Sequence, residues 1–298
     1  MHMVSNLSVS EEKINITHLL PLSPLSHLKT GGKALMASFP ENENDVFALI
    51  EYAVANGLRY RAAGGLSNTL IPDEGFDGLI IMMTDMKGIT ISGSTLTAAA
   101  GETLESCIRT SLGNSLSGLE HFSGIPGTIG GALAVNAGAD GAALSDYLLS
   151  AKVITRDGTL KRITREEGLF SYRSSNVRDD EVIVSVTLEL EKCDDISPSL
   201  EKSRLLRRKR TQEGQYDHPS LGCVFRNPEG DSAGRIIDSL GLKGLTHGGA
   251  CIAENHANFI VNTGTSTSSD YFSLAEAVRR TVLEKTGISL EYEIRFLK

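Results

Sequence analysis

The chain of 298 residues has the composition of an ordinary globular protein, with 40% hydrophobic residues, 22% charged residues and no tryptophan. This length suffices for two or three compact units, because single domains usually hold about 100–150 residues. A net charge of −8 argues against a general nucleic-acid-binding protein, since non-specific affinity for nucleic acid comes mainly from Lys and Arg side chains on phosphate. No apolar run approaches the roughly 20 residues that cross a bilayer, and residues 1–13 hold no secretion signal, so we expect a cytoplasmic protein without a nucleic-acid or membrane partner.

The N-terminal half predicts helices and strands in irregular alternation. We expect roughly the first 25 residues to form a loosely ordered lead-in. From Val46 to Val54, apolar residues recur at the spacing of one helical face, which predicts a helix over 41–57 that ends at Gly57. The other elements expected here are a strand over 58–63, a strand pair over 89–100 around Gly93, and a helix from Leu104 to Gly113.

The C-terminal half continues this mixture. A hairpin over 151–164 turns at Asp157-Gly158, a dipeptide that is typical of tight β-turns. Alternating valines and leucines predict a strand over 182–190 with one buried face. The remaining elements are a charged helix that ends near 210, an amphipathic helix over 271–282 stopped by Gly287, and a terminal strand over 290–297.

The chain divides near residue 195, where a connector leads into the charged helix. This predicts two regions, residues 1–195 and residues 196–298, and the irregular order of elements favours an α+β fold over a doubly wound sheet. The charged helix carries a basic run that is either a solvated helix face or a positive rim beside an anionic ligand. These residues are Lys202, Arg204, Arg207, Arg208, Lys209 and Arg210.

The cysteines give no sign of a metal site. No two of them form a C-x-x-C pair, and no His/Cys spacing matches a zinc site, so we expect no metal. Disulfides are not expected in a cytoplasmic protein of this size. Three of the four, Cys107, Cys193 and Cys251, are expected to be small buried residues, whereas the neighbours of Cys223 mark it out.

Two glycine clusters take the place of the usual nucleotide motifs, because neither G-x-G-x-x-G nor the P-loop pattern occurs. Each cluster alone is equally well explained as a tight turn. Together they favour a diphosphate cradle, since missing side chains let backbone N–H groups approach phosphate. The first is Gly64, Gly65, Leu66, Ser67 and Asn68, and the second is Ser123, Gly124, Pro126, Gly127, Thr128, Gly130 and Gly131, followed by Asn136.

Seven motifs together resemble the MurB family of UDP-N-acetylenolpyruvoylglucosamine reductases, and they occur in that family's order. The resemblance runs from TGGKA at 30–34 to the C-terminus, and its most specific parts are GIPGTIGGA and GCVFRNP. The motifs are GGLSN at 64–68, SGIPGTIGGALAVNAGA at 123–139, YRSS at 172–175, HPSLGCVFRNP at 218–228, AGRIIDSLGLKG at 233–244, ENHANFIVN at 254–262 and LEYEIRF at 290–296.

The resemblance implies an FAD-binding fold of the vanillyl-alcohol-oxidase (PCMH) type, whose two subdomains divide near residue 62, and a C-terminal α+β domain that closes on a UDP-sugar. It implies NADPH-dependent reduction of UDP-N-acetylenolpyruvoylglucosamine through FAD, in the synthesis of peptidoglycan precursors. The short interval between YRSS and HPSLGC resembles the smaller class of the family. We expect a small-molecule substrate and a monomer or weak dimer.

The resemblance also assigns catalytic roles. Arg173 corresponds to the cation that stabilises an enolate-like intermediate, and a planar guanidinium suits the substrate carboxylate. Glu293 corresponds to the catalytic glutamate, although Glu291 fits a polar strand position equally well. Cys223 corresponds to the proton donor, which is usually Ser. A free thiol, with a pKa of about 8.5, is an easier acid than a hydroxyl, but it is open to alkylation and oxidation.

Further site residues follow from the same resemblance. Arg226 and Asn227 correspond to substrate or diphosphate contacts, Tyr172 is expected near the flavin or substrate, and the glycine clusters, Asn136 and Ile183 are expected to bind FAD. The motif with His256 and Asn258 receives no role, and a structural histidine is the expected reading.

Two departures from the family pattern stand out. Leu66 and Thr69 replace the usual Gly and Leu, which predicts a reshaped loop, and the Lys-Gln-Pro before the donor motif is absent. The basic contact to the UDP diphosphate is therefore open, with Lys209 and Arg210 as candidates. The alternative functions are an FAD oxidase of the same fold and a non-catalytic nucleotide-sugar sensor.

Overall fold

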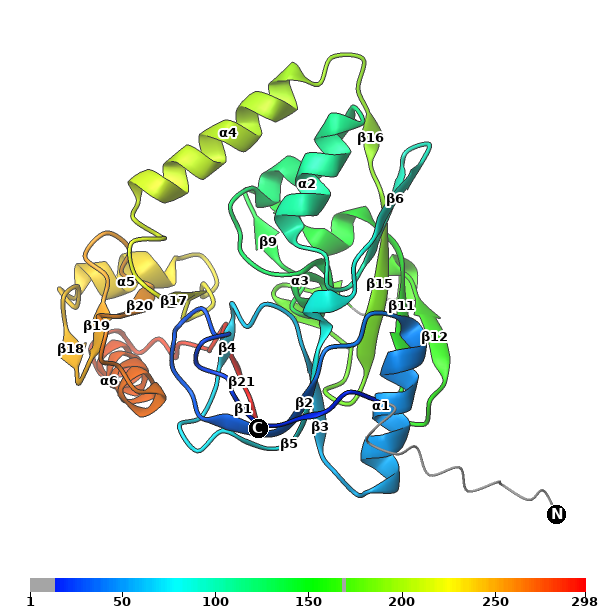
Figure 1. Cartoon of the computed structure of the whole chain (residues 1–298). Coiled ribbons are helices and arrows are strands. Elements are labelled where there is room, and N and C mark those ends of the chain that lie inside the picture. Colours follow the sequence, from blue (N-terminus) through cyan, green and yellow to red (C-terminus); the bar gives the residue numbers. More distant parts are fainter. Residues whose placement is uncertain (1–13, 168–169) are drawn as a thin grey trace.

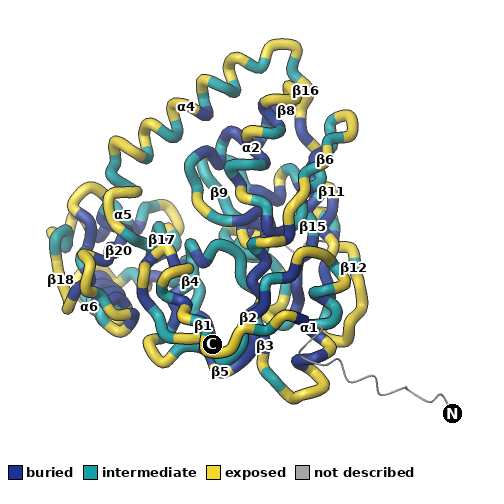
Figure 2. The backbone as a smooth tube through the Cα atoms, in the orientation of Figure 1, coloured by how far each residue is buried: buried dark blue, intermediate teal, exposed yellow. Residues whose placement is uncertain are grey.

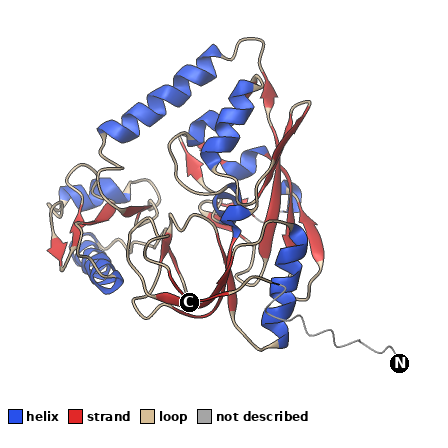
Figure 3. Ribbon diagram, viewed as in Figure 1, coloured by secondary structure: helices blue, strands red, loops and turns tan. Residues whose placement is uncertain are grey.

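The computed structural model describes residues 14–167 and 170–298, in which helices and strands are mixed along the chain (Figure 1, Figure 3). Three sheets of four or five strands organise this described part. The first two sheets lie in the N-terminal region, the third lies in the C-terminal region, and the end of the chain returns from the third sheet to the first.

The first sheet has the strand order β1-β2-β5-β3. Its strands are β1 (Thr17–Pro21), β2 (Lys33–Ser38), β3 (Tyr60–Ala63) and β5 (Phe76–Met82). The expected lead-in is wrong for residues 17–21, which pair antiparallel with β2, while residues 1–13 lie outside the described part. Because β3 and β5 pair in parallel, the first sheet extends past residue 62 to Met82.

Helix α1 (Glu43–Ala55) connects β2 to β3 and confirms the predicted helix. It begins after Asn42, whose side-chain oxygen accepts hydrogen bonds from the amides of Asn44 and Asp45 at 3.0 and 3.1 Å. This cap satisfies two amides that have no partner within the helix. The apolar face packs into a core shared with the second sheet through Val46, Leu49, Ile50 and Ala53.

The second sheet is antiparallel, with the order β12-β11-β15-β7-β6. Its strands are β6 (Ile89–Ser92), β7 (Thr95–Ala99), β11 (Leu148–Ile154), β12 (Leu160–Ile163) and β15 (Val182–Glu189). This confirms the predicted strand pair around Gly93, the hairpin at Asp157-Gly158 and the strand with one buried face. The helices α2 (Leu104–Gly113) and α3 (Ile129–Ala134) pack against this sheet and share its core.

The third sheet has the order β17-β20-β19-β18 and is antiparallel. Its strands are β17 (Ser220–Cys223), β18 (Thr246–His247), β19 (Ala250–Ile252) and β20 (Phe259–Asn262), and its helices are α5 (Ala233–Ser239) and α6 (Ser268–Thr286). Helix α6 ends at Gly287, whose φ of 73° lies in the left-handed region that glycine adopts freely. A separate apolar core lies between this sheet and the two helices.

Helix α4 (Ser197–Gln212) links the two regions and confirms the predicted charged helix. Figure 2 shows that it is mostly exposed or half-buried, in contrast to the sheets. Its one buried residue is Ser203. The helix therefore crosses the surface between the second and third sheets.

The C-terminal segment joins the regions a second time. The expected terminal strand is shortened to β21 (Arg295–Phe296), which pairs in parallel with β4 (Thr69–Leu70). The residues before it run beside the end of β17, where Tyr292 forms a bridge with Phe225. Leu297 enters the core of the first sheet, so the C-terminus lies beside that sheet (Figure 1).

Short elements complete the described part. The two-stranded pairs are β8 (Leu116–Ser117) with β16 (Glu191–Lys192), β9 (Gly138–Ala139) with β10 (Ala142–Ala143), and β13 (Phe170–Ser171) with β14 (Ser174–Ser175). The 3-10 helices are η2 (Met83–Asp85), η3 (Leu119–Phe122), η4 (Leu144–Tyr147) and η5 (Arg165–Glu167). Among the described residues, no helix combines the length and apolarity needed to span a membrane.

Candidate active site

A cavity of about 710 Å³ lies where the three sheets meet. This volume is in the range of small-molecule and cofactor sites. The structure places both glycine clusters and the three predicted catalytic residues on its wall. The predicted site residues that line it are Gly64, Gly65, Leu66, Ser67, Asn68, Gly124, Pro126, Gly127, Thr128, Gly130, Gly131, Arg173, Ile183, Cys223 and Glu293.

The two glycine clusters form loops that face each other. The Ser67 hydroxyl donates to the carbonyl oxygen of Pro126 at 3.1 Å. A Cβ atom on Gly65 would lie 3.6 Å from the Cα of Gly127, and one on Gly127 would lie 2.9 Å from the Ser67 hydroxyl oxygen. A side chain on either loop would therefore enter the space between them, which fits a cradle for an extended diphosphate-containing cofactor.

Leu66 keeps the backbone conformation of a glycine. Its φ of 50° lies in the left-handed region, where a non-glycine residue costs about 1–2 kcal/mol. Its side chain is buried in the core of the first sheet, and apolar burial of a leucine offsets a cost of this size. Thr69 lies in β4, which pairs with β21. Leu66 thus combines a strained backbone with an added core side chain, and the reshaping of the loop stays a prediction.

Three predicted cofactor residues make contacts that hold the cavity wall in place. The amide of Gly130 donates to the carbonyl of Ala100 at 3.0 Å, and a Cβ atom on Gly130 would lie 2.7 Å from the Ala100 Cβ. Ser123 is buried and its hydroxyl pairs with that of Ser203 at 2.7 Å. The buried Asn136 side chain donates to the carbonyl of Ser171 at 2.9 Å. Ser123 and Asn136 do not line the cavity, and Gly130 allows α3 to pack on β7.

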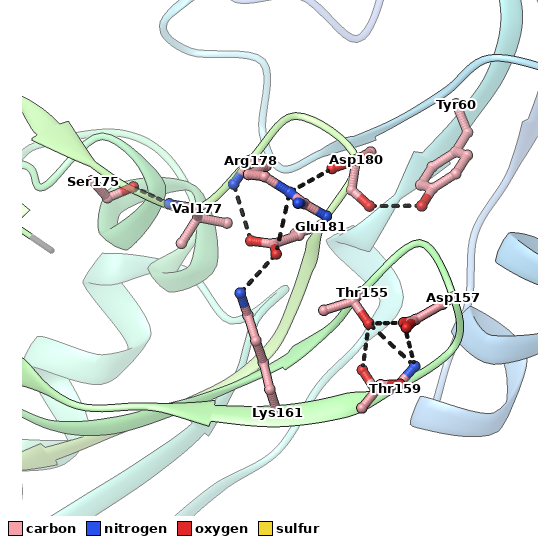
Figure 4. Close-up of polar contacts among 10 residues, drawn as sticks. All are labelled: Tyr60, Thr155, Asp157, Thr159, Lys161, Ser175, Val177, Arg178, Asp180 and Glu181. Carbon is pink, nitrogen blue, oxygen red and sulfur yellow. Dashed lines mark hydrogen bonds and ion pairs between the residues drawn. The ribbon is translucent and has the colours of Figure 1, made fainter. Parts of the chain in front are cut away.

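A polar segment over 178–181 forms the wall beside Ile183, and Figure 4 shows how it is held. The Tyr60 hydroxyl, from the first sheet, donates to the Asp180 carbonyl at 2.6 Å. Lys161, from the second sheet, donates to the buried Glu181 carboxylate at 2.6 Å. The segment is therefore tied to both N-terminal sheets.

Arg173 lies at the tip of the β13–β14 hairpin, with a φ of 54°. Such a conformation is uncommon for a non-glycine residue and recurs at functional sites. Its Nε lies 2.7 Å from Oε1 of Glu293, and the two side chains are only 21% and 18% exposed. The neighbouring Tyr172 stacks on this guanidinium, at 5.4 Å from its ring centre, but is largely exposed and does not line the cavity.

Glu293, rather than Glu291, faces the cavity. The Glu293 amide donates to the carbonyl of Val224 at 2.8 Å, which fixes the strand beside Cys223. Burial raises the pKa of the Glu293 carboxyl above its ordinary value, and Arg173 and Arg226 oppose the rise. The Glu291 side chain is 75% exposed and pairs with Arg226 at 3.5 Å. Of the two glutamates, Glu293 is the one on the cavity wall, and its catalytic role stays a prediction.

Cys223 ends β17 on the cavity wall, half-buried against a small apolar cluster of Ala253, Phe259 and Val261. Burial raises the pKa of its thiol to about 12, Glu293 adds to the rise, and Arg173 partly opposes it. The pKa of this thiol therefore lies well above the value of about 8.5 for a free thiol, and the role of Cys223 as the proton donor stays a prediction. The thiol stays protonated over the physiological range and is slow to form the reactive thiolate.

Arg226 and Asn227 do not line the cavity. An Nη2 atom of Arg226 donates to the carbonyl of Arg173 at 3.1 Å, so Arg226 supports the hairpin tip. The Asn227 side chain accepts from the amide of Ala233 at the start of α5, at 3.0 Å. In the structure, both side chains hold the backbone around the site. Their contacts with substrate stay predictions.

The remaining cysteines are free and only one is fully buried. Cys107 lies in the core of α2 as expected. The expected burial is wrong for Cys193 and Cys251, which are half-buried. Cys193 follows the exposed strand β16, and Cys251, in β19, packs against the small apolar cluster that Cys223 also contacts. Among the described residues, no group of His, Cys, Asp and Glu could hold a metal ion.

Several cations on the cavity wall were not predicted from the sequence. Six Lys and Arg line it against four Asp and Glu, so the wall carries a net charge of +2 in a chain of −8. The cations are Lys29, Arg61, Arg173, Arg178, Arg210 and Arg295. Arg295 follows Glu293 by two residues. Side chains two residues apart lie on the same side of a strand, so this spacing in the sequence could have identified Arg295 as a wall residue.

Lys29 and Arg210 differ from the other wall cations. Within the described ranges, neither has a carboxylate at ion-pair distance, whereas Arg61 and Arg295 lie 3.8 and 3.7 Å from Asp179. The Lys29 ammonium donates to the Pro24 carbonyl at 2.9 Å, and the Arg210 Nε donates to the Ser123 carbonyl at 3.1 Å. Of the two sequence candidates, Arg210 lines the cavity and Lys209 pairs with Glu213 at 3.9 Å.

Comparison with known proteins bears on both regions. Residues 34–164 match the family model described as an FAD binding domain, and residues 214–297 match the model described as UDP-N-acetylenolpyruvoylglucosamine reductase, C-terminal domain. These matches confirm the expected α+β fold, in which an FAD-binding region precedes a C-terminal domain.

Full-length relatives carry the same name. The chain is 35% identical over 296 residues to a UDP-N-acetylenolpyruvoylglucosamine reductase of Levilactobacillus brevis, covering 99% of this chain and 97% of that protein. It is 37% identical over 297 residues to one of Limosilactobacillus reuteri, covering 99% of each. The crystal structure of the MurB reductase from Thermus caldophilus superposes with a TM-score of 0.80 at 32% identity, covering 94% of this chain and 98% of that one.

Proposed function

This chain belongs to the MurB family of UDP-N-acetylenolpyruvoylglucosamine reductases, and we propose that it reduces the enolpyruvyl ether of UDP-N-acetylenolpyruvoylglucosamine at the expense of NADPH. The observation that carries the proposal is the single cavity in which two facing glycine loops lie opposite Cys223 and the Arg173–Glu293 ion pair. In this arrangement a bound cofactor would lie beside a substrate site that contains a proton donor. The product would enter the synthesis of peptidoglycan precursors.

The glycine loops are proposed to hold FAD. The two loops approach closely, since a Cβ atom on Gly64 would lie within van der Waals overlap of the Thr128 hydroxyl and one on Gly127 would lie 2.9 Å from the Ser67 hydroxyl oxygen, and the second loop leads into the N-terminus of α3. Both features suit a bound diphosphate. When bound, FAD supplies hydride chemistry between NADPH and the enolpyruvyl group. Ile183, on the same cavity wall, is proposed as a further cofactor contact.

Arg173 and Glu293 are proposed to manage charge on the substrate. When the β carbon of the enolpyruvyl group gains a hydride, negative charge develops at the α carbon and in the carboxylate. The Arg173 guanidinium is aimed into the cavity and held by Glu293 at 2.7 Å, so it is preorganised for that charge. Burial raises the pKa of the Glu293 carboxyl, and the Arg173 guanidinium beside it opposes the rise by favouring the carboxylate.

Cys223 is proposed to give the proton that completes the reaction. The proton passes from the sulfur to the α carbon, a C–H bond forms, and the electron pair of the S–H bond stays on the sulfur. The thiol regains a proton from solvent before the next turnover. A thiol with a pKa of about 12 is always loaded with its proton at neutral pH, and the strongly basic enolate provides the driving force.

Lys29 and Arg210 are proposed to contact the UDP diphosphate. Both line the cavity without a carboxylate partner in the described part of the chain, and the net +2 charge of the wall favours anionic ligands. Arg226, Asn227 and Tyr172 stay candidate substrate contacts. The Arg226 side chain lies against the hairpin tip that presents Arg173.

Further proposals concern organisation and place. We infer that the cofactor region ends near residue 195, since α4 begins at Ser197, and that residues 196–298 form the substrate region. The short connection through β15, β16 and α4 between YRSS and HPSLGC supports the smaller class of the family. We infer a cytoplasmic location, where NADPH is available, and action as a monomer or weak dimer on a small-molecule substrate.

Anaerobic stopped-flow spectroscopy tests the function directly. The purified protein should be yellow, NADPH should bleach it, and UDP-N-acetylenolpyruvoylglucosamine should restore the flavin spectrum with formation of UDP-N-acetylmuramate. A colourless protein that binds the nucleotide sugar would support a sensor instead. Bleaching by a small alcohol or sugar, with no response to the enolpyruvyl substrate, would support an oxidase.

A further inference from the structure

Asn258 is a buried amide directly behind the cavity wall. It is 3% exposed, precedes β20, and does not line the cavity. Burial of an amide is costly unless its polar atoms find partners. Every partner of the Asn258 side chain lies in the segment that carries Cys223.

The orientation of the Asn258 amide is set by one neighbour. Its Oδ1 accepts from the amide of Phe225 at 3.0 Å, and its Nδ2 donates to the carbonyl of Phe225 at 2.8 Å. A reversed amide would place two donors and two acceptors face to face, so only this orientation is satisfied. The second hydrogen on Nδ2 is left over, and Asn258 directly precedes Phe259, the residue that pairs with Cys223 between β17 and β20. Burial raises the pKa of the Cys223 thiol, and a side-chain hydrogen bond from Asn258 acts in the opposite direction.

The backbone of Asn258 ties the same segment to the catalytic glutamate. The amide of Val224 donates to the Asn258 carbonyl at 2.8 Å. The amide of Glu293 donates to the carbonyl of Val224, also at 2.8 Å. Residues 223–225 are thus held between Asn258 on one side and the terminal strand on the other, which fixes the position of Cys223 relative to Glu293.

We propose that Asn258 is a positioning residue for proton transfer, which aims the Cys223 thiol into the cavity and donates its remaining N–H to the sulfur as the proton leaves. The proposal rests on the proposed function. During the step the S–H bond breaks, the proton joins the α carbon of the substrate, and the electron pair stays on sulfur, where the Asn258 N–H stabilises it. Asn258 touches neither substrate nor cofactor and acts through Cys223.

Asn258→Asp is the sharpest variant. It keeps the shape of the side chain, and an Asp has at most one donor proton, which the Phe225 carbonyl takes. The hydrogen bond to sulfur is therefore lost in either protonation state of the Asp. Asn262→Asp is the matched control, because Asn262 is a buried amide on β20 that donates to the carbonyl of Leu28 at 2.9 Å, outside the segment of Cys223.

Two measurements read the contact without turnover. At pH 9, iodoacetamide should alkylate Cys223 about 10-fold more slowly in Asn258→Asp than in the wild type, since a hydrogen bond to a charged group is worth about that factor, and Asn262→Asp should show the wild-type rate. The side-chain amide proton resonances of Asn258 should differ between the wild type and Cys223→Ala. Equal alkylation rates together with unshifted resonances would overturn the contact, and the resonance test holds even if Asn258→Asp does not fold.

A double-mutant cycle of Asn258→Asp and Cys223→Ala tests whether Asn258 acts on the reaction through Cys223. We expect Asn258→Asp to slow flavin reoxidation by the enolpyruvyl substrate about 10- to 100-fold, with NADPH bleaching near normal. In the Cys223→Ala background the same change should add less than about 2-fold. Effects that multiply in the two backgrounds would show a general structural role and overturn the proposal. Absence of any reoxidation in the wild type would instead contradict the proposed function, and the alkylation and resonance tests would still decide the contact.

Discussion

The two walls of the cavity are built by different means. The wall from the cofactor-binding region consists of glycine loops, where the missing side chain of Gly65 faces Gly127. The wall from the C-terminal region consists of side chains, Cys223 and Glu293, which short backbone contacts hold in register. Arg173 reaches from the first region to pair with Glu293 across the junction.

This difference indicates how each wall responds to change. The glycine wall should fail when atoms are added, because added side chains occupy the cofactor space. The side-chain wall should fail when atoms are removed, because its acid and charges disappear while the cavity remains. The two kinds of damage should also separate in time, since loss of cofactor stops all chemistry and loss of the acid stops only its second half.

The largest effect is expected at the glycine wall. Gly65→Val should give folded but colourless protein with no turnover, because the new side chain enters the cofactor space. Gly130→Val looks equivalent in the sequence but should destabilise the fold by about 1–3 kcal/mol, since its Cβ would lie 2.7 Å from Ala100. Flavin absorbance and thermal unfolding distinguish the two outcomes.

Gly113→Ala is the control for both glycines, because a Cβ at that position meets no atom within 4 Å. It should keep both colour and stability. Full flavin occupancy in Gly65→Val would show that the first glycine loop is only a turn.

The next largest effect is expected at the ion pair. Arg173→Ala and Glu293→Gln should still bleach with NADPH but reoxidise about 10²- to 10³-fold more slowly with the enolpyruvyl substrate, the usual scale for a lost charge stabiliser. Glu291→Gln, two residues away and with a 75% exposed side chain, should change the rate little. Slow bleaching with normal reoxidation would place the pair in the NADPH step instead.

The sequence predicted those features that depend on residues close together in the chain. Glycine loops and amphipathic helices such as α1 and α6 depend on residues close in the chain, and their patterns are visible there. Tyr172 and Arg173 show where prediction from local sequence fails. They are adjacent in the sequence, yet a hairpin tip directs only Arg173 to the cavity.

The parts that could not be predicted depend on distant contacts. Lys29 comes from the N-terminal segment and Arg210 from the end of α4, and only the fold brings both to one wall. The pKa of Cys223 depends on its burial, which no neighbouring residue type reveals. The hydrogen bonds of Asn258 to Phe225 span 33 residues of chain.

The pH dependence gives a smaller but distinctive effect. Because burial raises the pKa of Cys223 to about 12, the protonated thiol is kept as pH rises, and the rate of flavin reoxidation should show no decline from Cys223 up to about pH 10. A thiol with the ordinary pKa of about 8.5 would produce such a decline. Rates of the wild type and Cys223→Ser, measured from pH 6 to 10, check this. A basic limb near pH 8.5 in the wild type alone would contradict it.

The smallest effect is expected where the walls are joined. Asp73 accepts hydrogen bonds from the amides of Ser268 and Ser269 at 2.8 and 2.9 Å, linking the first sheet to the start of α6. Burial alone would raise the pKa of Asp73, but these bonds and one from the Ser269 hydroxyl bring it below its ordinary value. Asp73→Asn should lower the free energy of unfolding by about 1 kcal/mol at pH 7.

The sign of its pH dependence follows from the lowered pKa. The stabilisation by Asp73 is present above the unfolded-state pKa of about 4 and is lost as pH falls through the lower folded-state pKa. Urea unfolding at pH 7 and pH 3 should therefore show the variant converging on the wild type at the lower pH. A difference that stays constant with pH would mean that charge on Asp73 plays no part.

Cys223 is proposed to supply the proton of the second half-reaction, and single-turnover reoxidation of Cys223→Ala shows whether it does. After anaerobic bleaching by NADPH at a near-normal rate, the variant should reoxidise with UDP-N-acetylenolpyruvoylglucosamine about 10²- to 10⁴-fold more slowly than the wild type, the usual scale for a lost general acid. Cys223→Ser, with a hydroxyl of similar shape, should keep substantial activity. If Cys223→Ala reoxidises at the wild-type rate, the proton donor is another group or water, and Cys223 is a packing residue.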